Sequence, residues 1–286
     1  MSAGGEVRAP RAAIIQFPGV NCEYESARAL AAAGAAPTIL RWNEAPERLR
    51  DFELYLLPGG FSYQDRIRAG AVAAKERVLD ALFDQAAAGK PILGICNGAQ
   101  VLVEAGFVPG LAAGAVEMAL APNRMPGRSG YFADWSHLAV AAATPSWLAP
   151  LAGQVLPIPF AHGEGRFTSR RAELFAELAA AGQIVLRYTG PQGEAAGGWP
   201  ANPNGSALDA AGICNPAGNV LALMPHPERA AHLGQVPALL AGPWGERRRA
   251  AAGDWAALAG PGPGLAIIAA MVAAARAGRR EGRHAS

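Results

Sequence analysis

Short apolar runs that alternate with helical stretches are the feature that most constrains the fold of this chain. Each run is too short for a core helix and is followed by a turn or by a stretch with helical periodicity. Such alternation is typical of a mostly parallel sheet with helices on both faces. We therefore expect an α/β fold, with strands over residues 11–17, 37–42, 54–57 and 91–95 and helices over residues 22–34, 69–89 and 97–106.

The second half of the chain has a different pattern, in which apolar runs are separated by turns rather than by helices. These runs cover residues 137–143, 154–165, 184–190 and 212–229, and "ICNPAGNVLAL" reads as a hairpin. We expect them to add antiparallel strands to the sheet. Residues 1–286 are interpreted as one domain, with a core over 11–230, an irregular insertion over 231–263 and a closing helix over 264–278.

Composition excludes several classes of protein. Of the 286 residues, 51% are hydrophobic and 17% charged, and the formal charge is +2, which is ordinary for a globular protein. No basic run with interleaved aromatics indicates nucleic-acid binding, and "GLAIIAAMVAAA" is too short to span a membrane. The start "MSAGGEVRAPR" shows no apolar signal segment, and three cysteines fit a reducing compartment. We expect a cytoplasmic location.

Cys96 stands out because it ends an expected strand at a sharp corner, in "GKPILGICNGAQVLVEAG". Gly94 and Gly98 flank it in the G-x-nucleophile-x-G form of a nucleophile elbow, which pushes the side chain out of the sheet. The helix that follows also favours thiolate over thiol. The alternative is a small buried residue in a glycine-rich turn. The position between a strand and a helix favours a nucleophile.

The other two cysteines lack this setting. Cys22 has no close glycine on both sides and Cys214 lies inside the hairpin, so core packing is the expected role of both. No C-x-x-C or H-x-x-x-H spacing occurs, and we expect no metal site.

A cysteine nucleophile needs a base, and His226 in "LALMPHPER" is the candidate. Prolines on both sides restrict the backbone to extended conformations, in which His226 and Glu228 share a face. Glu228 would then orient the ring toward the sulfur. The alternative is a buried histidine in a rigid turn. For the oxyanion hole, the amide of Asn97 and those of the turn at residues 58–60 are the candidate donors.

Segments well beyond these residues resemble a known family. "LPGGFSYQDRIRAGAVAA", "GKPILGICNGAQVLVEAG", "PFAHGEGRF" and "MPHPER" are similar to the class I (triad-type) glutamine amidotransferases, and within them to the glutaminase subunits of phosphoribosylformylglycinamidine synthase. The similarity covers roughly residues 12–230. The stretches "GGFSYQDRIRAGA" and "AHGEGR" are more specific to these subunits than the elbow. The resemblance implies a flavodoxin-like amidotransferase fold.

The resemblance also implies roles for single residues. Cys96 would attack the glutamine side-chain amide, His226 would act as base and later protonate ammonia, and Glu228 would be its partner. The remaining expected site residues line the oxyanion hole (Gly60 and Asn97) or contact the substrate (Gly59, Gln100, His162 and Glu164).

The same resemblance implies partners. No G-x-x-x-x-G-K-[ST] or G-x-G-x-x-G occurs in the chain, so we expect no cofactor on it. ATP and magnesium would bind a separate synthetase subunit, joined by a small accessory subunit. Departures from the family pattern occur at Asp134 and in apparent insertions over residues 193–203 and 230–264.

Two alternatives remain at this point. The chain could be the glutaminase subunit of another pathway, since the triad is shared. It could instead be a non-catalytic redox or stress protein with an elbow cysteine, although that class needs no His-Pro-Glu partner.

Overall fold

A computed structural model describes residues 8–284 of the chain, with side chains described as far as residue 278. The start of the chain at residues 1–7, where no signal segment is expected, lies outside this range. Eleven strands are present: β1 Arg11–Gln16, β2 Ala36–Arg41, β3 Leu54–Leu57, β4 Ile92–Ile95, β5 Ala119–Ala121, β6 Phe132–Val140, β7 Val155–His162, β8 Arg166–Thr168, β9 Ile184–Thr189, β10 Ala210–Cys214 and β11 Val220–Leu223 in the described residues. The α-helices of this range are α1 Glu23–Ala32, α2 Val78–Ala87, α3 Asn97–Glu104, α4 Leu174–Ala180, α5 Pro243–Ala250, α6 Trp255–Ala259 and α7 Pro263–His284.

One nine-stranded sheet forms the centre of the molecule, in the order β2-β1-β3-β4-β11-β10-β9-β6-β7. Strands β2, β1, β3, β4 and β11 are parallel to one another, whereas β10 pairs antiparallel with β11 and with β9, and β6 pairs antiparallel with β9 and β7. All residues of β3, β4 and β11 are buried, as expected for strands covered on both faces. The expected α/β fold with added antiparallel strands is confirmed.

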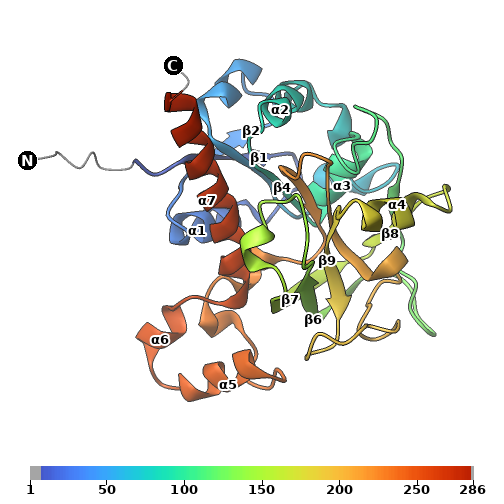
Figure 1. Cartoon of the computed structure of the whole chain (residues 1–286), viewed down its shortest axis with the longest axis vertical. Helices are drawn as coiled ribbons and strands as arrows, with labels where there is room; N and C mark the ends of the chain where they lie inside the picture. Colours follow the sequence, from blue (N-terminus) through green and yellow to red (C-terminus); the bar gives the residue numbers. More distant parts are fainter. Residues whose placement is uncertain (1–7, 285–286) are drawn as a thin grey trace, which may run out of the picture.

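Helices flank the parallel strands on two sides. Helices α1 and α7 pack on each other and lie on one side of the sheet, while α2 and α3 lie on the other (Figure 1). Helix α3 contacts β3, β4 and β11. It begins at the carboxyl end of β4, so its first residues lie at the edge of the sheet where chemistry gathers in such folds.

The expected helix over residues 69–89 is wrong in its first half. The structure has a short 3-10 turn at Ala73–Lys75, and α2 begins only at Val78 because Glu76 is extended. Gly70 has a φ of +80°, and a β-carbon there would lie 2.7 Å from the backbone of Gln100. The chain therefore turns here to pack on α3 instead of continuing a helix.

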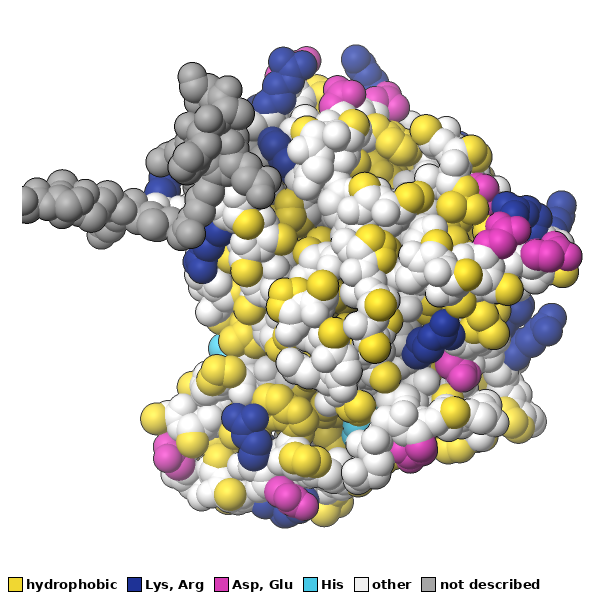
Figure 2. Space-filling model, in the orientation of Figure 1, with side chains coloured by type: hydrophobic (Ala, Val, Ile, Leu, Met, Phe, Trp, Pro, Cys, Tyr) yellow, Lys and Arg dark blue, Asp and Glu magenta, His cyan; other side chains and the backbone are white. Residues whose placement is uncertain are grey.

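The region over residues 231–263, expected to be irregular, carries short helices. A 3-10 turn at Leu233–Gln235 is followed by α5 and α6, which form the lobe at the bottom of Figure 1. Leu233, Val236 and Ala251 make a small core of their own. A cleft separates the lobe from β6 and β7, and Figure 2 shows its hydrophobic floor.

The closing helix α7 is longer than the expected 264–278. None of the helices in residues 8–284 is long and apolar enough to cross a membrane.

Candidate active site

Cys96 occupies a strained corner between β4 and α3. Its backbone has φ 50° and ψ −105°, a conformation that costs about 1–3 kcal/mol in a residue other than glycine. The flanking glycines make the corner possible. A β-carbon on Gly98 would lie 2.0 Å from the carbonyl oxygen of Leu57, and one on Gly94 would lie 2.5 Å from that of Gly98. The predicted elbow is present.

Three adjacent strand ends bring the candidate residues together. Strands β3, β4 and β11 lie side by side, and their carboxyl ends lead to the turn at residues 58–60, to Cys96 and to His226. A β-carbon built on Gly59 would lie 2.8 Å from Cε1 of His226 and 3.5 Å from Cβ of Cys96. The missing side chain at position 59 therefore lets the imidazole and the nucleophile approach each other.

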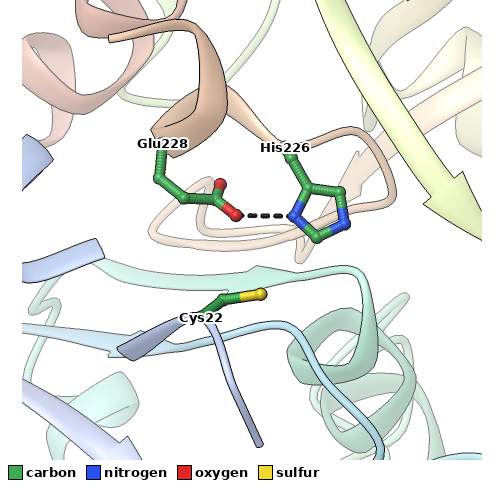
Figure 3. Close-up of side chains that lie close together, drawn as sticks. All are labelled: Cys22, His226 and Glu228. Atoms are coloured by element: carbon green, nitrogen blue, oxygen red, sulfur yellow. Dashed lines mark hydrogen bonds and ion pairs between the residues drawn. The ribbon is translucent and has the colours of Figure 1, made fainter. Parts of the chain in front are cut away.

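His226 and Glu228 form a buried pair behind the pocket. Nδ1 of His226 lies 2.5 Å from Oε1 of Glu228, and the two residues are 2% and 1% exposed (Figure 3). The two side chains pair as expected, but the expected extended backbone is wrong. The segment after His226 is the 3-10 turn Pro227–Ala230. The turn bends the carboxylate back under the ring.

The charge state of His226 follows from its neighbours. Burial lowers the pKa of His226, but the carboxylate of Glu228 and the neighbouring Cys96 and Cys22 outweigh it, so the pKa lies well above its usual value. Nε2 of His226 has no hydrogen-bond partner among the described residues, and Sγ of Cys96 lies 3.6 Å from the carbonyl oxygen of Ala161. In free enzymes such bonds are often long and tighten on substrate binding.

Two backbone amides are free to receive a developing oxyanion. Asn97 is the first residue of α3, so its N–H has no partner within the helix. The N–H of Gly60 makes no backbone hydrogen bond within residues 8–284. Gly60 has φ +143°, and a β-carbon there would lie 2.5 Å from Cα of Val20, which restricts this position to glycine.

The pocket in front of Cys96 has a volume of about 230 Å³. Of the predicted residues, Gly60, Cys96, Gln100, His162, Glu164 and His226 line it. Gly59 and Glu228 are buried behind this lining, and so is the side chain of Asn97. Asp134 is exposed on β6 and lies outside the pocket, where its carboxylate accepts a hydrogen bond from the amide of Trp135.

Gln100 and His162 are engaged with the protein rather than free. Nε2 of Gln100 donates to the carbonyl oxygen of Glu164 at 2.7 Å, and its Oε1 accepts from Asn97 at 2.9 Å. His162 is buried, and burial lowers its pKa to about 3, which keeps the ring neutral. Its Nδ1 pairs with Asn123 at 3.2 Å. Both side chains build the wall of the pocket.

Cys22 was expected to pack in the core, but the structure places it at the pocket. Its sulfur faces the His226–Glu228 pair (Figure 3) and accepts a hydrogen bond from Nη2 of Arg229 at 3.0 Å. Burial raises the pKa of the Cys22 thiol. Cys22 reaches the pocket because it follows the carboxyl end of β1, which lies next to β3 in the sheet.

Cys22, His226 and Glu228 also place a sulfur, a nitrogen and an oxygen within 4.8 Å of one another. Zinc accepts these donor types. However, the guanidinium of Arg229 lies 3.0 Å from the sulfur and 4.0 Å from the carboxylate, and its charge opposes a second cation. We assign no metal to this cluster.

Further residues of the pocket were missed at the sequence level. Asp65 follows the turn after β3, Tyr131 precedes β6, and Arg229 directly follows Glu228. Arg229 also binds Glu25 at 2.8 Å, which ties the turn after β11 to α1. The polar stretch "FSYQDR" at a strand end was the available signal for Asp65.

An elbow cysteine that faces a buried His-Glu pair across neighbouring strand ends defines the class of triad-type glutamine amidotransferases. Residues 9–258 match the family model of the CobB/CobQ-like glutamine amidotransferase domain. A phosphoribosylformylglycinamidine synthase subunit PurQ from Methanothrix thermoacetophila is 46% identical over 79% of this chain and 89% of its own length. Another from Thermosynechococcus vestitus is 43% identical over 76% of this chain and 85% of its own.

A solved structure agrees with these relatives. The structure of PurLQS from Thermotoga maritima contains a chain that is 34% identical, with a TM-score of 0.62, over 78% of this chain and 90% of that one. The present chain therefore belongs to the glutamine amidotransferases and, within them, to the PurQ family.

Proposed function

We propose that this chain hydrolyses L-glutamine to glutamate and delivers the ammonia to a separate ATP-dependent synthetase subunit, which converts formylglycinamide ribonucleotide to formylglycinamidine ribonucleotide in purine biosynthesis. The observation that carries the proposal is the buried His226–Glu228 pair, which faces a pocket that also holds Cys96 on a strained elbow. Identity of 46% to a PurQ subunit supports the choice of pathway.

The chemistry follows from the position of each group. The thiolate of Cys96 attacks the amide carbon of glutamine, and the amides of Gly60 and Asn97 stabilise the oxyanion. His226, held as an imidazolium by Glu228, gives its proton to the departing ammonia and leaves a thioester on Cys96. Water then attacks the thioester while His226 takes its proton, and glutamate is released with the thiolate restored.

The partner follows from the relatives and from the reaction. The solved relative comes from the structure of PurLQS, and we propose that this chain assembles with a synthetase subunit and a small accessory subunit. ATP and magnesium bind the synthetase subunit in this assembly. The complex acts in the cytoplasm, and ammonia passes within the protein.

The arrangement also bears on the redox alternative. A redox-sensing cysteine needs no oriented base. In this chain the carboxylate of Glu228, which is 1% exposed, binds the imidazole of His226 and orients it. The amidotransferase is the function that the geometry supports.

The test is co-purification of the chain with the synthetase subunit, followed by a glutaminase assay with and without ribonucleotide and ATP. Weak hydrolysis by the chain alone and a rise of at least tenfold in the complex are expected. Equal turnover with and without the partner would contradict the proposed coupling. Unaltered hydrolysis by a Cys96→Ala variant would contradict the proposed chemistry.

A further inference from the structure

Arg229 lies where the turn that carries His226 and Glu228 meets helix α1. Its Nε donates a hydrogen bond to Oε1 of Glu25 in α1 at 2.8 Å, and its Nη2 donates to the sulfur of Cys22 at 3.0 Å. Nε also lies 4.0 Å from Oε1 of Glu228. One guanidinium thus joins the turn after β11 to α1 and to the residue that precedes this helix.

Arg229 and Glu25 form an ion pair that is partly sheltered from solvent, since their side chains are 35% and 26% exposed. Burial raises the pKa of Glu25, but its neighbours, Arg229 first among them, outweigh it, and the pKa lies below its usual value. Burial lowers the pKa of Arg229, but Glu25, Cys22 and Glu228 outweigh it, and the pKa lies above its usual value. Both groups therefore stay charged at neutral pH.

The carboxylate of Glu228 has few contacts of its own. Oε1 binds Nδ1 of His226 at 2.5 Å, while Oε2 is buried without a hydrogen-bond partner within residues 8–278. The guanidinium of Arg229 approaches Oε1, the same oxygen that binds the imidazole. A single hydrogen bond leaves the carboxylate free to rotate away from the ring, and the positive charge beside Oε1 opposes that rotation.

The backbone of the turn is fixed on its other sides. The amide of His226 donates to the carbonyl oxygen of Pro159 in β7 at 2.7 Å. A β-carbon on Gly264, near the start of α7, would lie 2.0 Å from the carbonyl oxygen of Pro227, so α7 packs directly on the turn. Removal of the guanidinium of Arg229 should therefore disturb the side chains behind the pocket more than the path of the chain.

We propose that Arg229 is a positioning residue that holds the His226–Glu228 pair in its catalytic orientation, with Glu25 as its anchor on α1. This inference rests on the proposed function, because it concerns the base that acts with Cys96. Arg229 also lines the pocket, whereas Glu25 is not among the described residues that line it. A role through the pair therefore predicts that loss of the anchor alone, outside the pocket, slows the reaction.

The test measures kcat and KM for glutamine in the complex with the synthetase subunit. Arg229→Met removes a hydrogen bond between charged groups at a partly exposed site, so kcat is expected to fall by about 10- to 30-fold while KM stays within about threefold of wild type. Arg229→Lys keeps the positive charge and should be at least about threefold faster than Arg229→Met. Glu25→Gln weakens the anchor and should lower kcat by about three- to tenfold.

A double substitution separates one shared role from two independent ones. If Glu25 acts only through Arg229, then Arg229→Met has the same kcat with and without Glu25→Gln. The matched control is the exposed ion pair of Arg171 and Glu177, whose charged atoms lie 2.5 Å apart. Arg171→Met and Glu177→Gln should change neither kcat nor KM.

Several results would overturn the positioning role. A raised KM with unchanged kcat in Arg229→Met would make Arg229 a substrate contact instead, and losses that multiply in the double variant would make the two residues independent. A Glu25→Gln variant with wild-type kcat would remove the anchor, even where Arg229→Met does not fold. If the wild-type complex hydrolysed no glutamine, the proposed function would fail, whereas an active wild type with an equally active Arg229→Met would remove only the positioning role.

Discussion

Substitution of Glu228 by Gln keeps the size of the side chain but removes the charge that supports the imidazolium of His226. The two groups are 2.5 Å apart and almost fully buried. At an effective dielectric constant of about 20, two unit charges about 4 Å apart interact by about 4 kcal/mol. Since 1.36 kcal/mol corresponds to a factor of ten in rate, the expected loss in kcat for glutamine hydrolysis is about 10³-fold.

The same substitution should alter the pH dependence of thiol reactivity. In the wild type, Glu228 is the strongest of the influences that raise the pKa of His226, and burial opposes it. Without the carboxylate, burial is opposed less strongly and the pKa of His226 should fall, so a smaller fraction of His226 carries the proton that faces Cys96. Alkylation of Cys96 by iodoacetamide at neutral pH should then be slower in Glu228→Gln than in the wild type.

The assays are glutamine turnover by the complex and alkylation rate against pH. Glu177→Gln makes the same chemical change in an exposed ion pair with Arg171 and should leave both unchanged. A Glu228→Gln variant that kept a third or more of the wild-type kcat would contradict the role assigned to Glu228. An alkylation profile that coincided with that of the wild type would refute it as well.

Other consequences of the structure can be measured separately. Gly98→Ala places a β-carbon 2.0 Å from a backbone oxygen of β3. The free energy of unfolding, measured in urea, should therefore fall by about 3 kcal/mol or more. The control is Gly89→Ala, where the space around the β-carbon is open and the expected loss is about 1 kcal/mol. Equal effects of the two would contradict the tight elbow. Cys22→Ala removes the sulfur that accepts a hydrogen bond from the guanidinium of Arg229, so the free energy of unfolding should fall by about 1–2 kcal/mol. The kcat for glutamine should fall less than tenfold. A loss of kcat equal to that of Cys96→Ala would make Cys22 part of the chemistry.

The core of the fold could be predicted from local pattern. The strands at residues 54–57 and 91–95 are short, wholly apolar runs, and the structure buries every residue of β3 and β4. The elbow at Cys96 could be predicted equally well, because the flanking glycines and the change from strand to helix all lie within one short segment of the sequence. The missed sheet of β5 and β8 has only three residues in each strand, too few for a periodic signal.

Other features depend on contacts between distant parts of the chain, so the local sequence pattern could not predict them. The broken helix before Val78 depends on the close approach of Gly70 to α3, a contact between distant parts of the chain. Cys22 looked like a core residue because its window contains no partner. Only the pairing of β1 with β3 brings it beside His226. Glu228 was identified as a partner of His226, but through an extended segment that the structure replaces by a 3-10 turn.

In the proposed reaction Cys96, and not its neighbour Cys22, attacks the glutamine side chain. The most direct measurement is peptide mass spectrometry after treatment of the complex with a glutamine-mimicking chloroketone, with and without excess glutamine. This role of Cys96 predicts one adduct, on Cys96, whose formation glutamine prevents and which is absent from Cys96→Ala. An adduct that formed on Cys22 instead, or on Cys96 without protection by glutamine, would contradict it.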